Sequence, residues 1–205
     1  MRPKVGAVRS DTMATLPLPV TGNDDADTLL AEDPLALLMG MLLDQQVPME
    51  RAFLAPFTLT GRLGRALDAS AIAAMDPDEF LEIFCRVPAL HRFPGSMGKR
   101  VQAMCQVLVD DHNGRAQDVW EGAADGADLL ARLRALPGFG EEKSRIFVAV
   151  LAKRFGVKPK GWEQAAGPFA DKTPRSVADI DSRASFERVR AWKKEQKAKG
   201  LRKSD

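Results

Sequence analysis

Apolar residues recur along the chain at helical spacing from Asn23 onward, whereas the alternating pattern of a strand is scarce. The stretch 35–43 is apolar nearly all round, which predicts a buried central helix. Asp33 is a good N-cap, and Pro34 suits the first helical position because an N–H there would have no helical partner. We therefore predict an all-α fold of about ten short helices.

Further helix starts are marked by prolines and by side chains that favour N-caps. These marks are Pro48, Asp68, Asp76 and Ser182. Amphipathic stretches predict helices over 99–110 and 146–151, and a leucine stripe predicts another over 129–136. Trp120 and Trp192 are expected in the core.

Three regions of different character divide the chain. Segment 1–15 is unpatterned, so we expect a disordered N-terminal extension, within which Met13 is a plausible second start. Residues 16–182 are expected to form a single helical domain, and residues 183–205 a basic C-terminal helix and tail. The tail carries a charge of +6 and the remaining 182 residues carry −4. Such a tail is either a solvated segment or an arm for phosphate.

Length and composition restrict the class of protein. The chain has 205 residues, a net charge of +2 and 45% hydrophobic residues, which suits one globular domain or two lobes that share a core. Its apolar runs fall short of the roughly 18–20 residues of a membrane span, so we expect a soluble, cytoplasmic monomer. Two cysteines and two isolated histidines lack metal-ligand spacing, so neither a metal nor a cofactor is expected.

The segment Leu136–Gly140, which reads Leu-Pro-Gly-Phe-Gly, is the most specific chemical feature of the chain. It forms the turn of an expected hairpin of helices at about 127–153. Gly138 and Gly140 permit positive φ and let backbone N–H groups point outward without a Cβ in the way. The following helix directs its unpaired N–H groups and its positive dipole end to the same side. This pattern predicts a phosphate site, although tight turns between helices also use glycine for steric reasons alone.

The segment resembles the helix-hairpin-helix of the base-excision DNA glycosylases, the superfamily that contains endonuclease III, the adenine glycosylase MutY and the alkylpurine glycosylases. Residues 42–47 are similar to the family segment in which a buried helix ends in a glutamine-bearing loop. Residues 97–103 are similar to the lysine-rich helix start before the hairpin. All three occur in the family's order, and the chain most resembles the actinobacterial helix-hairpin-helix-GPD branch. The resemblance implies a two-lobed, all-α, DNA-glycosylase-like fold.

The same resemblance implies that double-stranded DNA is the partner and that one nucleotide is extruded into a cleft between the lobes. Gln46 matches the glutamine that fills the gap left by the extruded base. The residues expected to contact DNA are Gln45, Gln46, Gly138, Phe139, Gly140, Lys143, Ser144 and Trp162. The two glutamines also suit the polar end of a buried helix.

The catalytic aspartate of the family has no direct match in this chain. The resemblance places it roughly twenty residues past the second hairpin glycine, about five and a half helical turns, where the sequence has Lys160–Trp162. Glu163 is the nearest acid, and Asp171 is the next if an inserted loop precedes it. A carboxylate at the catalytic position would stabilise positive charge on the sugar as the base leaves.

The lysine with which some family members cleave the DNA strand is also displaced. Its position, two residues past the second hairpin glycine, holds Glu142, and Lys143 lies about 100° further round the helix. We therefore expect a monofunctional DNA N-glycosylase, without Schiff-base lyase activity, that hydrolyses the bond to a damaged or mispaired base. The alternative is a non-catalytic relative that binds distorted or damaged DNA. A third interpretation is an interaction module in which the hairpin is a plain helical turn.

Overall fold

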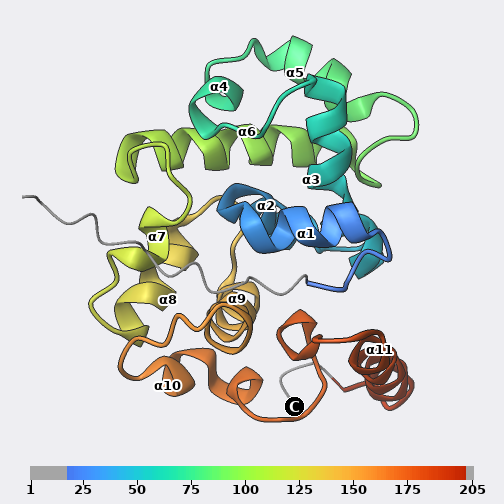
Figure 1. Ribbon diagram of the computed structural model, residues 1–205, viewed down its shortest axis with the longest axis vertical. Coiled ribbons are helices and arrows are strands. Elements are labelled where there is room, and N and C mark those ends of the chain that lie inside the picture. Colours follow the sequence, from blue (N-terminus) through green and yellow to red (C-terminus); the bar gives the residue numbers. More distant parts are fainter. Residues whose placement is uncertain (1–17, 202–205) are drawn as a thin grey trace, which may run out of the picture.

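The computed structural model describes residues 18–201, in which every regular element is a helix (Figure 1). The α-helices are α1 (Asp24–Glu32), α2 (Pro34–Leu43), α3 (Met49–Leu63), α4 (Ala69–Ala73), α5 (Pro77–Cys85), α6 (Pro94–Asp111), α7 (Asp118–Glu121), α8 (Gly126–Ala135), α9 (Glu141–Arg154), α10 (Trp162–Ala166) and α11 (Arg183–Ala198). Two 3₁₀ helices lie between α10 and α11: η1 (Gly167–Ala170) and η2 (Val177–Asp179). None of these helices is long and apolar enough to cross a membrane. The all-α prediction is confirmed, whereas the extension at 1–15 and the second start at Met13 lie outside the described residues.

Most helices begin where the capping residues predict. Four of the predicted caps accept a first-turn N–H through their side chains: Asp33, Asp68, Asp76 and Ser182. Such bonds satisfy donors that a helix leaves without an internal partner. Helix α6 differs from the prediction, because it begins at Pro94 rather than at Lys99. Pro94 needs no N–H partner in the first turn, so the helix can start there.

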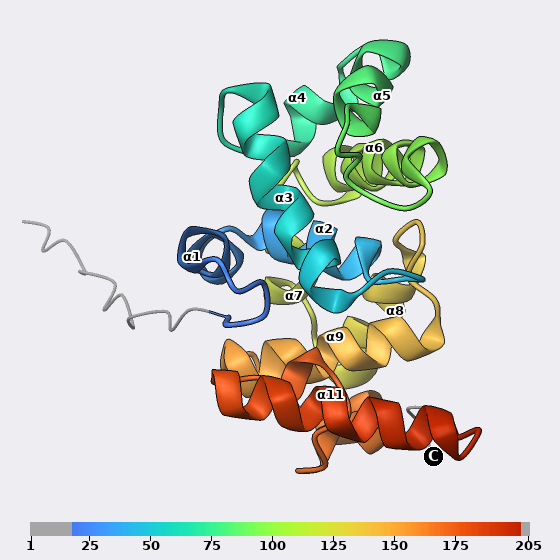
Figure 2. The same ribbon diagram turned by 90° about the vertical axis from the view of Figure 1, so that its right-hand side faces the viewer.

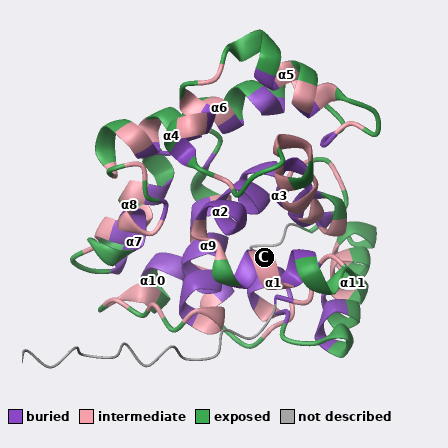
Figure 3. Ribbon diagram, turned by 45° about the horizontal axis from the view of Figure 1, so that its top comes forward, coloured by how far each residue is buried: buried purple, intermediate pink, exposed green. Residues whose placement is uncertain are grey.

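Helix α2 occupies the middle of the molecule, between two lobes (Figures 1 and 2). One lobe contains α3–α6, in which α4 and α5 pack on α6. The other contains α8–α11, in which α8, α10 and η2 pack on α9. Residues 35–43 of α2 are all buried (Figure 3), as predicted for a central helix. The two-lobed arrangement implied by the resemblance is thus present.

Helix α11 packs against the second lobe. Phe186 and Val189 are fully buried, and α11 contacts η2. Helix α11 runs antiparallel to α9 (Figure 2), so its C-terminal half lies beside the first turn of α9. Trp120 is buried as predicted. Trp192 is only half-buried, because its ring lies at the surface of α11 with the guanidinium of Arg175 5.5 Å away.

Candidate functional site

The hairpin loop, Leu136–Gly140, joins α8 to α9 and packs against the last turn of α2. Gly138 has a φ of +83°, and a Cβ built there would lie 2.4 Å from Leu42 Cδ1, so both the backbone and the available space require glycine. Gly140 differs from the expectation of positive φ. Its φ is −85°, and a Cβ there would meet open space. The fold therefore requires glycine at position 138 but leaves room for a side chain at position 140.

Gly140 is also the N-cap of α9, and no side chain caps this helix. The positive end of the helix dipole therefore acts at an exposed glycine, which is a favourable place for an anion. Glu141 places a carboxylate nearby, but Arg134 at 3.0 Å and Arg145 at 2.7 Å compensate its charge. The loop thus presents an exposed helix N-terminus whose positive dipole end suits an anion such as a phosphate.

Lys143 connects the hairpin to the end of α2. Its Nζ donates hydrogen bonds to the carbonyl oxygens of Met41 at 2.8 Å and Leu42 at 2.6 Å. The last carbonyls of a helix have no partner within it, and a cation there also favours the negative dipole end. In this structure the Lys143 amine is therefore engaged by α2, and it holds the hairpin and α2 together.

Two further residues expected to contact DNA lie in the core. Ser144 is fully buried, so its hydroxyl is not available to a phosphate in this structure. Phe139 is 5% exposed and packs edge-on against Phe147, with ring centroids 5.9 Å apart. Ser144 belongs to the buried part of α9, and the Phe139 ring, in the loop before this helix, packs against it through Phe147.

The Gln46 loop, residues Asp44–Pro48, follows α2 and precedes α3. Gln46 is exposed and has a φ of +56°, a conformation that costs a non-glycine residue energy and is typical of functional positions. The side chain of Gln45 folds back instead. Its Nε2 donates to the Leu42 carbonyl at 2.9 Å, and its Oε1 accepts from Arg100 at 3.2 Å. Of the two predicted glutamines, Gln46 is the one whose side chain is exposed.

A cavity of about 410 Å³ lies beside Gln46, lined by residues 44–50 together with Arg190 and Lys193 of α11. A second cavity adjoins it at Lys193 and extends to Glu142 and Trp192. We call the first of these the Gln46 cavity. It lies where the end of α2, the start of α3 and the C-terminal half of α11 meet. This is a junction of the two lobes.

The position of Arg190 and Lys193 beside this cavity could not be predicted from the sequence. Arg190 forms an ion pair with Glu50 at 3.7 Å, and the Nζ of Lys193 lies 3.7 Å from the sulfur of Met49. In the sequence these cations belong to a basic tail, and nothing in their spacing shows which element they face. Their excess of positive charge was the only available signal.

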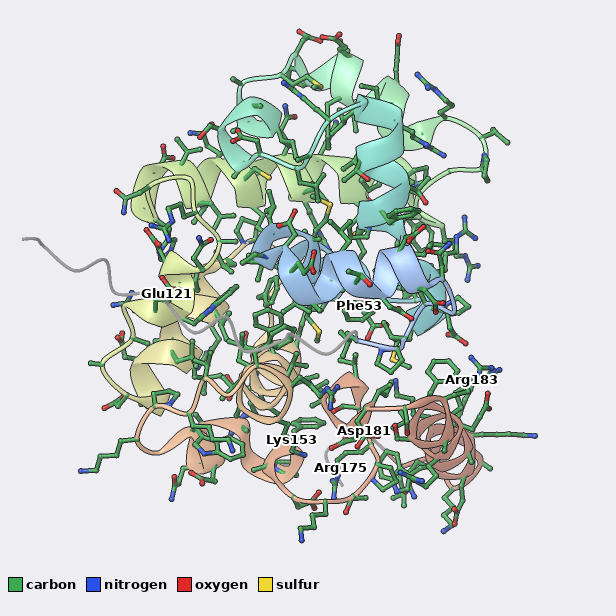
Figure 4. All side chains as sticks on the ribbon, viewed as in Figure 1. Phe53, Glu121, Lys153, Arg175, Asp181 and Arg183 are labelled. Carbon is green, nitrogen blue, oxygen red and sulfur yellow. The ribbon has the colours of Figure 1, made fainter. Side chains whose placement is uncertain are left out.

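Glu163, Asp171 and Trp162 lie elsewhere. Glu163 is exposed on α10, which packs on α8 and α9. Asp171 and Trp162 line a separate cavity, which also contains Lys153 from the last turn of α9. Figure 4 labels Lys153 and marks this part of the molecule. Lys153 is about 16 Å along α9 from Glu142. The structure therefore does not bring the predicted acids or Trp162 to the Gln46 cavity.

Asp171 also has partners of its own. Its carboxylate accepts hydrogen bonds from Arg175 at 2.9 Å and from the Thr173 N–H at 2.8 Å. These bonds are those of a turn, and they leave the group paired. Within the described residues no cluster of His, Cys, Asp and Glu could hold a metal ion.

The buried ring of His91 contacts the backbone of the Gln46 loop. The ring is 1% exposed, its Nε2 lies 3.0 Å from the Gln45 carbonyl oxygen, and its Nδ1 accepts from the Phe93 N–H at 3.0 Å. A carbonyl only accepts, so the neutral ring with its proton on Nε2 satisfies both partners. Burial lowers the pKa of His91, and the cations Arg51 and Lys143 act in the same direction.

Comparison with known proteins finds a matching family and similar solved structures. A sequence model of the family described as "HhH-GPD superfamily base excision DNA repair protein" matches residues 39–204. Among solved structures, a trapped endonuclease III–DNA covalent intermediate is 15% identical, with a TM-score of 0.43 over 81% of this chain and 80% of that one. A thermostable thymine-DNA glycosylase is 11% identical, with a TM-score of 0.40 over 81% and 74%. No curated protein matches the chain.

The two hairpin glycines should respond differently to substitution. Gly138→Ala should lower the free energy of unfolding by about 2 kcal/mol, because it adds strain at positive φ and a clash with Leu42. Gly140→Ser should leave it unchanged or raise it by up to about 1 kcal/mol, because serine is a good N-cap and has room. Urea denaturation measures both. A loss at Gly140 as large as that at Gly138 would contradict the assignment.

His91 should make stability depend on pH. Its folded pKa lies below the ordinary 6.5, so between these two values the unfolded chain binds a proton that the folded protein does not. The free energy of unfolding should therefore fall as pH drops from about 7.5 to about 5. The fall should be shallower in His91→Gln, which has no titrating ring. Urea denaturation at the two pH values tests this, and equal slopes in both proteins would assign the effect to other groups.

Proposed function

The chain belongs to the HhH-GPD superfamily of base excision DNA repair proteins, and from this premise we propose that it is a monofunctional DNA N-glycosylase. The hairpin loop holds one phosphate of duplex DNA, Gln46 enters the duplex, and a damaged or mispaired base is extruded into the Gln46 cavity. Hydrolysis of its glycosidic bond follows there. Glu142 stands at the position where the resemblance implies a Schiff-base lysine, so no strand cleavage by that route is proposed.

One observation carries the proposal: the exposed, positive-φ Gln46 lies next to a cavity and is tied to the hairpin through the end of α2. Gly138 packs on Leu42, and Lys143 binds the carbonyl of the same residue. A phosphate held at the hairpin would therefore lie at a set distance from Gln46. Extruding a base costs a few kcal/mol, and a polar side chain that fills the gap offsets part of that cost.

Helix α11 supplies positive charge along the same surface. Arg190 lies near its middle, and its C-terminal half carries Lys193, Lys194 and Lys197. The antiparallel packing places this half beside the first turn of α9, where Lys193 and Lys197 line a cavity with Glu142. Phosphate contacts by such cations provide affinity without sequence preference. The tail therefore acts as part of the DNA-binding surface.

The catalytic carboxylate is proposed to come from the cavity itself. Asp44 and Glu50 line it, whereas Glu163 and Asp171 do not. As the base departs, the sugar gains positive charge, which a carboxylate within the cavity would stabilise while it orients the attacking water. Glu50, in the first turn of α3, is 32% exposed, and its pairing with Arg190 keeps it directed toward α11.

The alternative is a protein that binds distorted DNA without cutting the glycosidic bond. The pairing of Glu50 with Arg190 favours it, since a carboxylate held by a guanidinium is less free to act on a sugar. Both functions use the same hairpin and the same glutamine. Base release separates them.

Base release from a panel of lesion-containing duplexes tests the assignment of residues. Gln46→Ala should slow release about tenfold, because the flipped state loses its support. Glu50→Gln or Asp44→Asn, whichever carries the reaction, should slow it about a hundredfold. Glu163→Gln and Asp171→Asn are the matched controls and should react like the wild type. If base release slows only in a control variant, the catalytic acid is Glu163 or Asp171. If no lesion is released by the wild type, the protein binds distorted DNA without cutting the glycosidic bond.

The salt dependence of duplex affinity tests the role of α11. Replacing Lys194 and Lys197 by Gln should weaken binding and reduce the slope of log K against log salt by about 1–2. Replacing Arg183 and Arg188 by Gln removes the same charge from the opposite end of the helix, and this control should bind like the wild type. Equal losses in the two double variants would mean that only net charge matters.

A further inference from the structure

We propose that His91 is a positioning residue that joins the Gln46 loop to a second loop, so that Gln46 and Phe93 meet DNA at a fixed spacing. The second loop, here the Phe93 loop, comprises residues Arg86–Phe93 between α5 and α6. The inference rests on the proposed function for its role with DNA. The link between the loops is a property of the protein alone.

The geometry of the link is a single rigid ring between two backbones. The Nε2 of His91 donates to the Gln45 carbonyl and its Nδ1 accepts from the Phe93 N–H, each at 3.0 Å. An imidazole has no rotatable bond between its two nitrogens, so the two loops stay one ring-width apart. The ring is 1% exposed, and water therefore does not replace either bond at low cost.

The Phe93 loop has the character of a contact surface. Val87 is 90% exposed and Phe93 is 43% exposed, and among the described residues only Leu201 joins them as an exposed large hydrophobic side chain. Val87 and Phe93 thus give this one loop two of the three large apolar side chains that are exposed within residues 18–201. Phe93 is linked to the Gln46 loop through His91, and its ring has Arg92 5.4 Å away, so this pair suits the bases and phosphates of DNA.

The rest of the Phe93 loop is anchored to α3 and not to the Gln46 loop. Arg51 donates to the Ala89 carbonyl at 2.9 Å, and Arg62 donates to the Pro88 carbonyl at 2.6 Å. These bonds hold the base of the loop. Within the described residues, the His91 ring is the hydrogen-bonded link between the backbones of Gln45 and Phe93, and hence the group that sets their spacing.

Two substitutions of His91 each remove one of the two hydrogen bonds that its ring makes. In His91→Gln the amide nitrogen reaches about as far as Nε2 and can still donate to Gln45, but no atom replaces Nδ1. In His91→Asn the carbonyl oxygen can still accept from the N–H two residues ahead, as in an Asx turn, but nothing reaches Gln45. Each variant retains one of the two bonds, so each is expected to fold.

Hydrogen–deuterium exchange of the free, full-length protein tests the link without DNA. We expect exchange to rise about tenfold at 92–94 in His91→Gln and at 44–48 in His91→Asn, with the other loop close to wild type. Exchange that changes in neither loop, or equally in both loops of both variants, would overturn the proposal.

Fluorescence of 2-aminopurine, placed beside an abasic-site analogue in a duplex, tests the consequence with DNA. The wild type should unstack the probe and raise its fluorescence, and both variants should raise it less at saturating protein. Variants that unstack the probe as well as the wild type would overturn the role of His91 alone. A wild type that binds but does not unstack the probe would instead contradict the proposed function, and with it any role of the link in DNA.

Discussion

The carbonyl end of α2 is the constraint on which the rest of the site depends. A helix buried along its whole length cannot leave its last carbonyl groups unpaired without a cost of about 1–3 kcal/mol each. The backbone N–H groups of Asp44 and Gln45 bind the carbonyls of Met41 and Leu43, whereas side chains bind that of Leu42. Lys143 arrives from α9 and Gln45 from the following loop, and both bind the Leu42 carbonyl. Satisfying this one helix end brings the hairpin and the Gln46 loop together.

This junction gives the molecule its functional geometry. The hairpin offers an exposed glycine at a helix N-terminus, and Gln46 projects from the other side of the same junction. Helix α11 closes the cavity beside Gln46 and adds cations from the second lobe. A chain of net charge +2 can in this way present a locally positive surface, because Lys193 and Lys197 of α11 lie beside the first turn of α9.

Much of the fold could be predicted because its signals are local. Aspartate and serine caps, prolines at first turns and an apolar stretch each act within a few residues, and Gly138 was found from its place between two helices. The site was less predictable because its partners are distant in the chain. Nothing near Lys143 shows that its amine binds carbonyls about a hundred residues earlier. The residue count that suggested Glu163 depends on how the chain runs after α9. The chain there forms α10, whose Glu163 does not line the Gln46 cavity.

Hydrogen–deuterium exchange with and without a duplex that contains an abasic-site analogue tests the junction most directly. If one phosphate is held by the hairpin while Gln46 enters the duplex, DNA should slow exchange at 138–143 and at 44–48 together. The cavity beside Lys153, at the other end of α9, should exchange as before. Protection of only one of the two segments, or protection centred on Lys153, would contradict a hairpin and a glutamine that act as one unit.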